Sequence, residues 1–211
     1  MRCAGWLWLA IAGVALAADK LVVGNFSAGD LKGWDRKSFK GETVYTIAQS
    51  DGRTALRAES HAAASGRYRE IKVDLRQTPF IHWSWRVDNV LNGVDERSKA
   101  GDDYPARVYV VVSGGALFWK TRSLVYVWSS GQPVGSNWEN AYTGNARQIA
   151  VRSGTRDLGR WLTEKRNIRD DFTRLFGDTI DHIDAVAVMT DTDNSGQAAV
   201  AWYGDIVFTS D

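Results

Sequence analysis

The sequence predicts an all-β fold, a single-domain, two-sheet β-sandwich of the jelly-roll type with at most one short helix. Two observations carry this prediction. Roughly ten short runs alternate apolar and polar residues or are rich in β-branched residues, and turn-forming residues separate them. Only one segment, residues 170–176, has apolar residues at helical spacing, and Gly177 follows it as a stop.

The first 17 residues are typical of a secretory signal peptide. Arg2 is followed by the apolar residues 6–16, which are too few to span a bilayer comfortably, and by the small-residue cleavage pattern at 15–17. We therefore expect residues 18–211 to form one domain that is periplasmic or secreted. Cys3 lies in the segment to be removed, so the mature chain would contain neither a disulfide nor a thiolate.

The charge balance limits the classes of partner. The chain has 26 basic and 25 acidic residues, which argues against a general affinity for nucleic acid or an anionic membrane. No stretch after the leader is apolar enough to span a membrane, and we expect a monomer. Ten tryptophans, two of them in the leader, offer large flat faces for a core or for stacking on sugar rings.

The strands predicted in the first half of the chain are residues 21–23, 43–48, 54–59, 69–75 and 80–88. Asp51-Gly52 joins the second and third as a hairpin, because this pair favours the tight turn that antiparallel strands need. In the fifth strand Trp83 and Trp85 share one face with other apolar residues, and His82 and Arg86 share the other. Phe26, Gly33 and Trp34 follow the first of these strands, and we expect them to lie in a loop.

The strands predicted in the second half are residues 106–113, 123–129, 148–152, 160–168, 183–190 and 198–208. The first two are apolar on both faces, which indicates central positions. The last two are expected to pair as a closing hairpin around the turn 191–196. Two long polar loops, 89–104 and 130–145, flank the central strands.

Several short motifs occur in order along most of the mature chain. They are WSWRV at 83–87, GDDY at 101–104, ARVYV at 106–110, YVW at 126–128, NAYT at 140–143, GRW at 159–161, MTDTDN at 189–194 and YGDI at 203–206. In these motifs the chain resembles a bacterial family of secreted proteins, domain of unknown function 3047, which implies export and supplies no activity. The opening Phe26…Gly33-Trp34 and the closing YGDI are also similar to galactose-binding-like jelly rolls and carbohydrate-binding modules, a likeness at the level of the fold.

The first candidate ligand-binding set surrounds the entry to the strand at 106–113, where loop chemistry meets a rigid element. Its members are Arg86, Glu96, Lys99, Asp102, Asp103 and Arg107. Asp102 and Asp103 are adjacent, so in extended chain their side chains diverge, one toward a pocket and the other into the loop. An arginine here either clamps a ligand carboxylate or pairs with Asp102 or Asp103, and the internal pair is the simpler interpretation.

The second candidate set is aromatic and lies on or beside the second long loop. It comprises Trp128, Trp138, Asn140 and Tyr142. Exposed rings beside an amide suit a sugar, whose apolar face stacks while its hydroxyls form hydrogen bonds. Core packing is the alternative, and it applies less well to Trp138 because its neighbours are polar.

The third candidate set is a metal site at Asp191, Asp193 and Asn194. Oxygens at alternate positions before Gly196 match the front half of an EF-hand calcium loop, but the twelfth position is Trp202 rather than a bidentate glutamate. An EF-hand is thereby excluded. A turn whose side chains cap their own backbone is favoured over a calcium ion held by this loop and oxygens from elsewhere.

These sets lead to three functional hypotheses. The leading one is an exported, non-catalytic β-sandwich that binds a polysaccharide or small polar ligand where the two long loops meet the turn 191–196. The second is an enzyme, a glycoside hydrolase or lyase that would use a carboxylate pair drawn from Glu96, Asp102, Asp103 and Glu139. Other enzyme classes have little support, because no cysteine nucleophile, G-x-S-x-G motif or metal-type histidine spacing occurs. The last is a structural envelope protein without a ligand.

Overall fold

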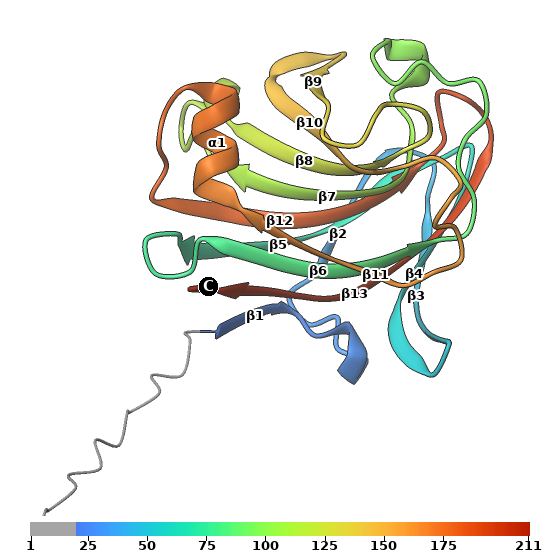
Figure 1. The fold of residues 1–211 in the computed structure, drawn as a ribbon, viewed down its shortest axis with the longest axis horizontal. Coiled ribbons are helices and arrows are strands. Elements are labelled where there is room, and N and C mark those ends of the chain that lie inside the picture. Colours follow the sequence, from blue (N-terminus) through green and yellow to red (C-terminus); the bar gives the residue numbers. More distant parts are fainter. Residues whose placement is uncertain (1–19) are drawn as a thin grey trace, which may run out of the picture.

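A computed structural model describes residues 20–211, and the predicted signal peptide lies outside the described residues. The described chain forms two β-sheets packed face to face, with a single α-helix at one end (Figure 1). The predicted all-β, two-sheet jelly-roll sandwich is therefore confirmed.

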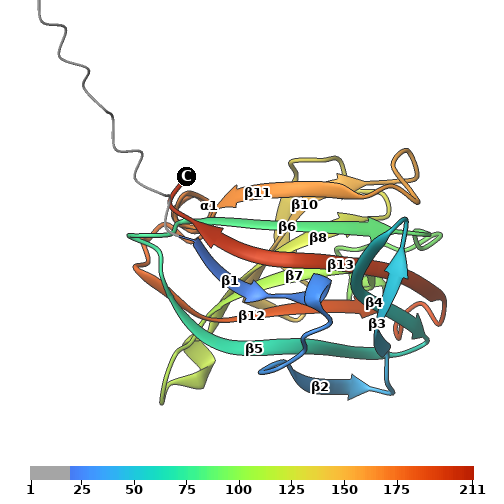
Figure 2. The same ribbon diagram turned by 90° about the horizontal axis from the view of Figure 1, so that it is seen from below.

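One sheet contains six strands in the order β11-β6-β13-β4-β3, with β1 pairing on β13. Figure 2 views the molecule from the side of this sheet, with β11, β6 and β13 lying side by side. Its strands are β1 (Lys20–Gly24), β3 (Val44–Ser50), β4 (Arg53–His61), β6 (Phe80–Val87), β11 (Leu162–Asn167) and β13 (Ala198–Thr209).

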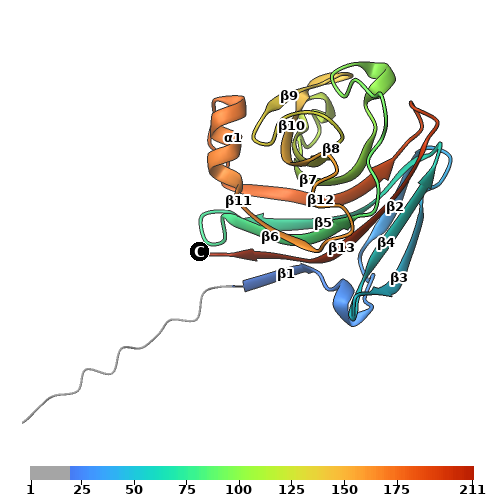
Figure 3. The ribbon, with the colours of Figure 1, turned by 45° about the vertical axis from the view of Figure 1, so that its right-hand side comes forward.

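The other sheet contains seven strands in the order β2-β5-β12-β7-β8-β10-β9. They are β2 (Asp35–Lys40), β5 (Ala64–Asp74), β7 (Tyr104–Val112), β8 (Arg122–Ser129), β9 (Asn137–Asn140), β10 (Thr143–Ser153) and β12 (His182–Asp191). β8 and β10 are parallel, while the other pairs in this sheet are antiparallel. Figure 3 shows β8, β10 and β9 curling above β7.

Short helical segments lie between some of the strands. Three single 3-10 turns, η1 (Phe26–Ala28), η2 (Lys99–Gly101) and η3 (Phe118–Lys120), lie in connections. The predicted helix is present as α1 (Ile168–Phe176). Asn167 caps it by accepting hydrogen bonds from the backbone N–H groups of Arg169 and Asp170, and Gly177 ends it in the left-handed conformation. Within residues 20–211 no helix is both long enough and apolar enough to cross a membrane.

Aromatic side chains fill the space between the sheets. Trp83 and Trp85 point inward from β6, as their alternation predicts, and Trp85 meets Trp128 of β8 with ring centroids 6.0 Å apart. Trp83 also packs on Tyr126 at 5.2 Å. Trp128 is fully buried here, so the expectation that it contacts a ligand is wrong.

The expected closing hairpin is also wrong, because β12 belongs to the seven-stranded sheet and β13 to the six-stranded sheet. Residues 192–197 cross between the sheets instead of turning within one. The backbone N–H of Thr192 donates to Ala63, and that of Ala62 donates to Gln197, so the crossover runs beside the β4–β5 connection. Sequence pattern identified both strands but not their partners, which are distant in sequence.

The sequence pattern did not predict two edge strands. All six residues of β2 are exposed, so it has no apolar alternation to mark it. The four-residue β9 lies inside the predicted loop 130–145 and carries one buried residue, Trp138. Each strand exists because a neighbour, β5 or β10, offers it a hydrogen-bonding edge.

A buried carboxylate ties α1 to the sandwich and gives a test of the fold. Asp171 accepts hydrogen bonds from Arg166 Nε at 2.8 Å, Arg174 Nη2 at 2.9 Å and the Tyr126 hydroxyl at 2.9 Å. Burial alone would raise the pKa of Asp171, but Arg166 and Arg174 outweigh it and hold this pKa below its usual range.

We expect Asp171→Asn to lower the free energy of unfolding by about 1–3 kcal/mol at neutral pH, because a charged hydrogen-bond acceptor is lost. A lowered folded-state pKa stabilises the fold above the unfolded pKa, and this contribution is lost as pH falls below about 4. Urea denaturation from neutral to acidic pH should therefore show wild type and variant converging in acid. The exposed Asp170→Asn change is the control, and parallel pH curves for wild type and Asp171→Asn would contradict the assignment.

Candidate functional site

A cavity of about 440 Å³ lies on the outer face of the seven-stranded sheet. Side chains reach it because residues alternate along each strand: Val108 and Val110 of β7 point into the core, while Arg107 and Tyr109 point outward. The polar residues at the cavity are Asp102, Arg107, Asn140, Asp191, Asp193 and Asn194. The remaining lining is apolar or aromatic and includes Phe39, Tyr109, Val125, Tyr142 and Met189.

Three segments far apart in sequence meet here: the loop before β7, the β9–β10 connection and the crossover after β12. The side-chain amide of Asn140 donates to Asp102 at 2.9 Å. The amide of Asn194 donates to the hydroxyl of Tyr142 at 3.2 Å, and that hydroxyl donates to the Lys99 carbonyl at 3.1 Å. The predicted meeting of the two long loops with the turn 191–196 is therefore present.

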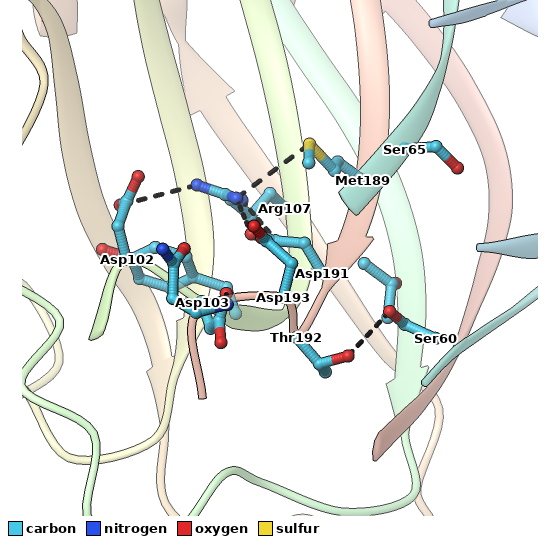
Figure 4. A network of polar contacts seen from close by, with 12 residues as sticks. Ser60, Ser65, Asp102, Asp103, Arg107, Met189, Asp191, Thr192 and Asp193 are labelled. Carbon is cyan, nitrogen blue, oxygen red and sulfur yellow. Dashed lines mark hydrogen bonds and ion pairs between the residues drawn. The ribbon is translucent and has the colours of Figure 1, made fainter. Parts of the chain in front are cut away.

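Arg107 lies at the centre of this cluster and is only 4% exposed (Figure 4). Its Nε donates to Asp191 at 2.9 Å and its Nη2 contacts the second oxygen of the same carboxylate, a two-point ion pair. Its Nη1 is 3.6 Å from Asp102, and its guanidinium lies 4.6 Å from the Tyr104 ring centroid. The structure has an internal pair as expected, but its main partner is Asp191, which the sequence did not suggest, and Asp102 is the more distant second carboxylate.

Electrostatics keep Arg107 charged. Burial alone would lower the pKa of the guanidinium, but the carboxylates of Asp191 and Asp102 outweigh it and hold the pKa of Arg107 above its usual range. A buried cation of this kind is stable only while its partners remain, because an unpaired charge in a dry site costs several kcal/mol.

Carboxylates outnumber cations at one end of the cavity. One oxygen from each of Asp103, Asp191 and Asp193 lies within 4.8 Å of the others. Asp103 accepts the backbone N–H groups of Asn194 at 3.2 Å and Ser195 at 2.6 Å, which fixes the crossover in place. Burial and the neighbouring Asp103 raise the pKa of Asp193, while Lys40, 3.9 Å away, opposes the shift.

Two predicted ligand-binding residues, Glu96 and Trp138, do not line the cavity but hold the segments around it together. Glu96 is 1% exposed and accepts hydrogen bonds from the Ser129 hydroxyl and, at 2.6 Å, from the Ser130 backbone N–H. Burial raises the pKa of Glu96, which these bonds oppose. Trp138 is buried and donates to the Glu96 carbonyl at 3.2 Å, so both residues join the loop 89–104 to β8 and β9.

Arg86 and Lys99 have different positions. Arg86 lies on β6 of the opposite sheet, where it pairs with Asp88 at 2.8 Å and Asp51 at 2.7 Å, so its assignment to this site is corrected. Lys99 is exposed, and its ammonium group lies 5.3 Å from the Tyr142 ring centroid, at the rim of the cavity.

Phe39, Tyr109 and Met189 line the cavity but were not predicted from the sequence. Tyr109 could have been found, since it alternates with buried valines beside the predicted Arg107. Met189 pairs with Arg107 across β12 and β7, a neighbour that only the strand register supplies. Phe39 is on β2, which the sequence pattern did not identify as a strand.

The fold and cavity define a β-sandwich with an open polar and aromatic site on one sheet face. The family model described as "Protein of unknown function (DUF3047)" matches residues 32–207, so the chain belongs to this family and the resemblance seen in its motifs is confirmed. A search of curated proteins found no match.

Solved structures with a similar fold include carbohydrate-binding modules. The family 11 module from Clostridium thermocellum in complex with a β-1,3-1,4-mixed-linked tetrasaccharide has 10% identity and a TM-score of 0.50, covering 92% of this chain and 96% of that one. The same module, from the cellulosomal cellulase Lic26A-Cel5E, gives 10% identity, coverages of 92% and 95%, and a TM-score of 0.49. The family 29 module CBM29_1 from Piromyces equi has 10% identity and a TM-score of 0.42, and the match covers 93% of each chain. At these identities the likeness concerns the fold alone.

Removing one partner of the buried ion pair should be strongly destabilising. We expect Arg107→Met to lower the free energy of unfolding by about 3–5 kcal/mol, because the buried carboxyl of Asp191 loses the partner that compensates for its burial. The double change Arg107→Met with Asp191→Leu removes both charges and should lose less than Arg107→Met alone. Urea denaturation of the three proteins measures this, and an equal or larger loss in the double variant would contradict the assignment.

Calcium binding at Asp191, Asp193 and Asn194 remains a prediction to be tested. Both oxygens of Asp191 contact Arg107, and those of Asp103 accept backbone N–H groups, so these carboxylates are already partnered. We expect added Ca²⁺ to leave the Tm of chelator-treated protein unchanged, as measured by differential scanning calorimetry. A Ca²⁺-dependent rise in Tm that is lost in Asp193→Asn would instead establish the metal site.

Proposed function

We propose that this chain is an exported, non-catalytic β-sandwich that binds a carbohydrate or a similar hydroxylated ligand in the cavity on its seven-stranded sheet. The observation that carries the proposal is the combination of rigidly held hydrogen-bonding groups with exposed rings in one cavity. Asn140 and Asn194 offer amides, Asp193 offers a partly exposed carboxylate, and Tyr142 and Phe39 offer ring faces.

Sugars present hydroxyl edges and apolar ring faces together, and this lining has partners for both. Phe39 is 68% exposed and Tyr142 is 56% exposed, so both rings are accessible to a ligand. Asn140 is already oriented by Asp102, which reduces the entropy lost when a ligand binds. Tyr142 and Phe39 take the stacking role that the sequence had suggested for Trp138.

The pairing of the carboxylates favours binding over catalysis. A glycoside hydrolase needs one carboxyl as acid and another as base or nucleophile on opposite sides of the scissile bond. Asp102 accepts a hydrogen bond from Asn140, and Asp103 accepts one from the Ser195 backbone N–H. Glu96 accepts one from the Ser129 hydroxyl, and Glu139 pairs with Arg147 at 2.8 Å. Each of the four is thus engaged within the protein.

Export is part of the same proposal. It is supported by Arg2, the apolar residues 6–16 and the small-residue pattern at 15–17. A periplasmic or extracellular location would bring the cavity into contact with envelope or environmental polysaccharides.

A glycan array followed by calorimetry tests the binding site. We expect Tyr142→Ala and Phe39→Ala each to weaken binding of the selected glycan about tenfold, the equivalent of 1.4 kcal/mol, because each removes an exposed ring contact. Val44→Ala, an exposed change on β3 of the other sheet, serves as the matched control and should bind normally. Failure to bind any glycan, or unchanged affinity in both ring variants, would overturn the proposal.

A further inference from the structure

A second cavity of about 510 Å³ continues from the first along the same sheet face. The two share Phe39, Tyr109 and Met189, so together they form one groove across β2, β5, β12 and β7. Beyond the shared residues, the second cavity is bordered by Lys37, Arg67 and Thr121 and by the smaller or apolar residues Gly66, Tyr68, Val111, Ala185, Ala187 and Val188. We refer to this part as the apolar arm, because its walls are almost entirely carbon.

Small residues between large ones create the apolar arm. Across the sheet, Tyr68 of β5 pairs with Ala187 of β12, which pairs with Tyr109 of β7. Side chains of paired residues stand on the same face about 5 Å apart, so the methyl group of Ala187 lies at the bottom between two tyrosine rings. In the next row Gly66 has no side chain to fill the cavity. A Cβ at this position would lie 3.0 Å from the Val188 carbonyl oxygen, which is a tight contact.

The groove therefore changes character along its length. At one end the ligand would meet Asn140, Asp193 and Asn194, and at the other it would meet aliphatic and aromatic carbon. A linear polysaccharide carries hydroxyls along its whole length. Those placed in the apolar arm would lose water without gaining a hydrogen bond, and each unsatisfied hydroxyl costs about 1–3 kcal/mol.

We propose that the ligand is an amphiphile: a sugar head bound at the polar end and a single hydrocarbon chain lying in the apolar arm. This inference rests on the proposed function, since the head occupies the same carbohydrate site. The chain leaves water as it enters the arm, so each CH₂ group adds about 0.8 kcal/mol, which is about a fourfold gain in affinity. The gain stops once the arm is filled.

Calorimetry with n-alkyl β-glucosides and n-alkyl β-maltosides, used below their micelle concentrations, tests the proposal alongside free glucose and maltose. We expect the Kd to fall about fourfold for each added CH₂ from butyl upward, and then to level off. The variant Ala187→Phe fills the floor of the arm, so its Kd should not depend on chain length. Ala198→Phe, at an exposed position on the opposite sheet, is the matched control and should retain the wild-type dependence.

The outcomes separate this inference from the proposed function. Glycan binding with no gain from an alkyl chain overturns the amphiphile and leaves the carbohydrate site standing. Equal binding of alkylphosphocholines with the same chains overturns the sugar head. If neither the array glycans nor any glycoside bind, both proposals fail. The wild-type chain-length series decides the inference by itself should Ala187→Phe not fold.

Discussion

The site depends on keeping one buried guanidinium charged. Arg107 points out of the sheet, yet it is buried, because the loop 89–104 and the crossover after β12 close over it. Each closing segment brings a carboxylate, Asp102 from the loop and Asp191 from the end of β12. Without these partners the cation would have to be hydrated, and the loop could not close.

The same closure joins the site to the body of the sandwich. Asp103 holds the backbone of residues 194 and 195, which carry the chain from one sheet to the other. On the other side, Trp138 and Glu96 attach the loop to β8 and β9. The amides of Asn140 and Asn194 and the ring of Tyr142 are consequently mounted on segments held at both ends, which gives loop residues rigidity.

The sequence predicted local features well and non-local ones poorly. Alternation placed Trp83 and Trp85 inward, and Gly177 marked the end of α1, because a few neighbouring residues determine both. It did not identify β2, whose exposed residues become a strand only beside β5, nor the separation of β12 from β13 into two sheets. The polar site residues from three segments were anticipated by type, whereas the burial of Trp128 and Trp138 was left open against ligand stacking, since composition cannot distinguish a core ring from an exposed one.

The edge position of β2 has a consequence for the ligand binding proposed above. This strand carries Phe39, a shared wall of both cavities, yet β5 is the one strand with which it pairs. An outermost ladder with few buried contacts opens at a lower free energy than the strands inside the sheet. We therefore expect this wall to yield more readily than the Arg107 cluster, so the proposed site would discriminate more strictly at its polar end than along the apolar arm.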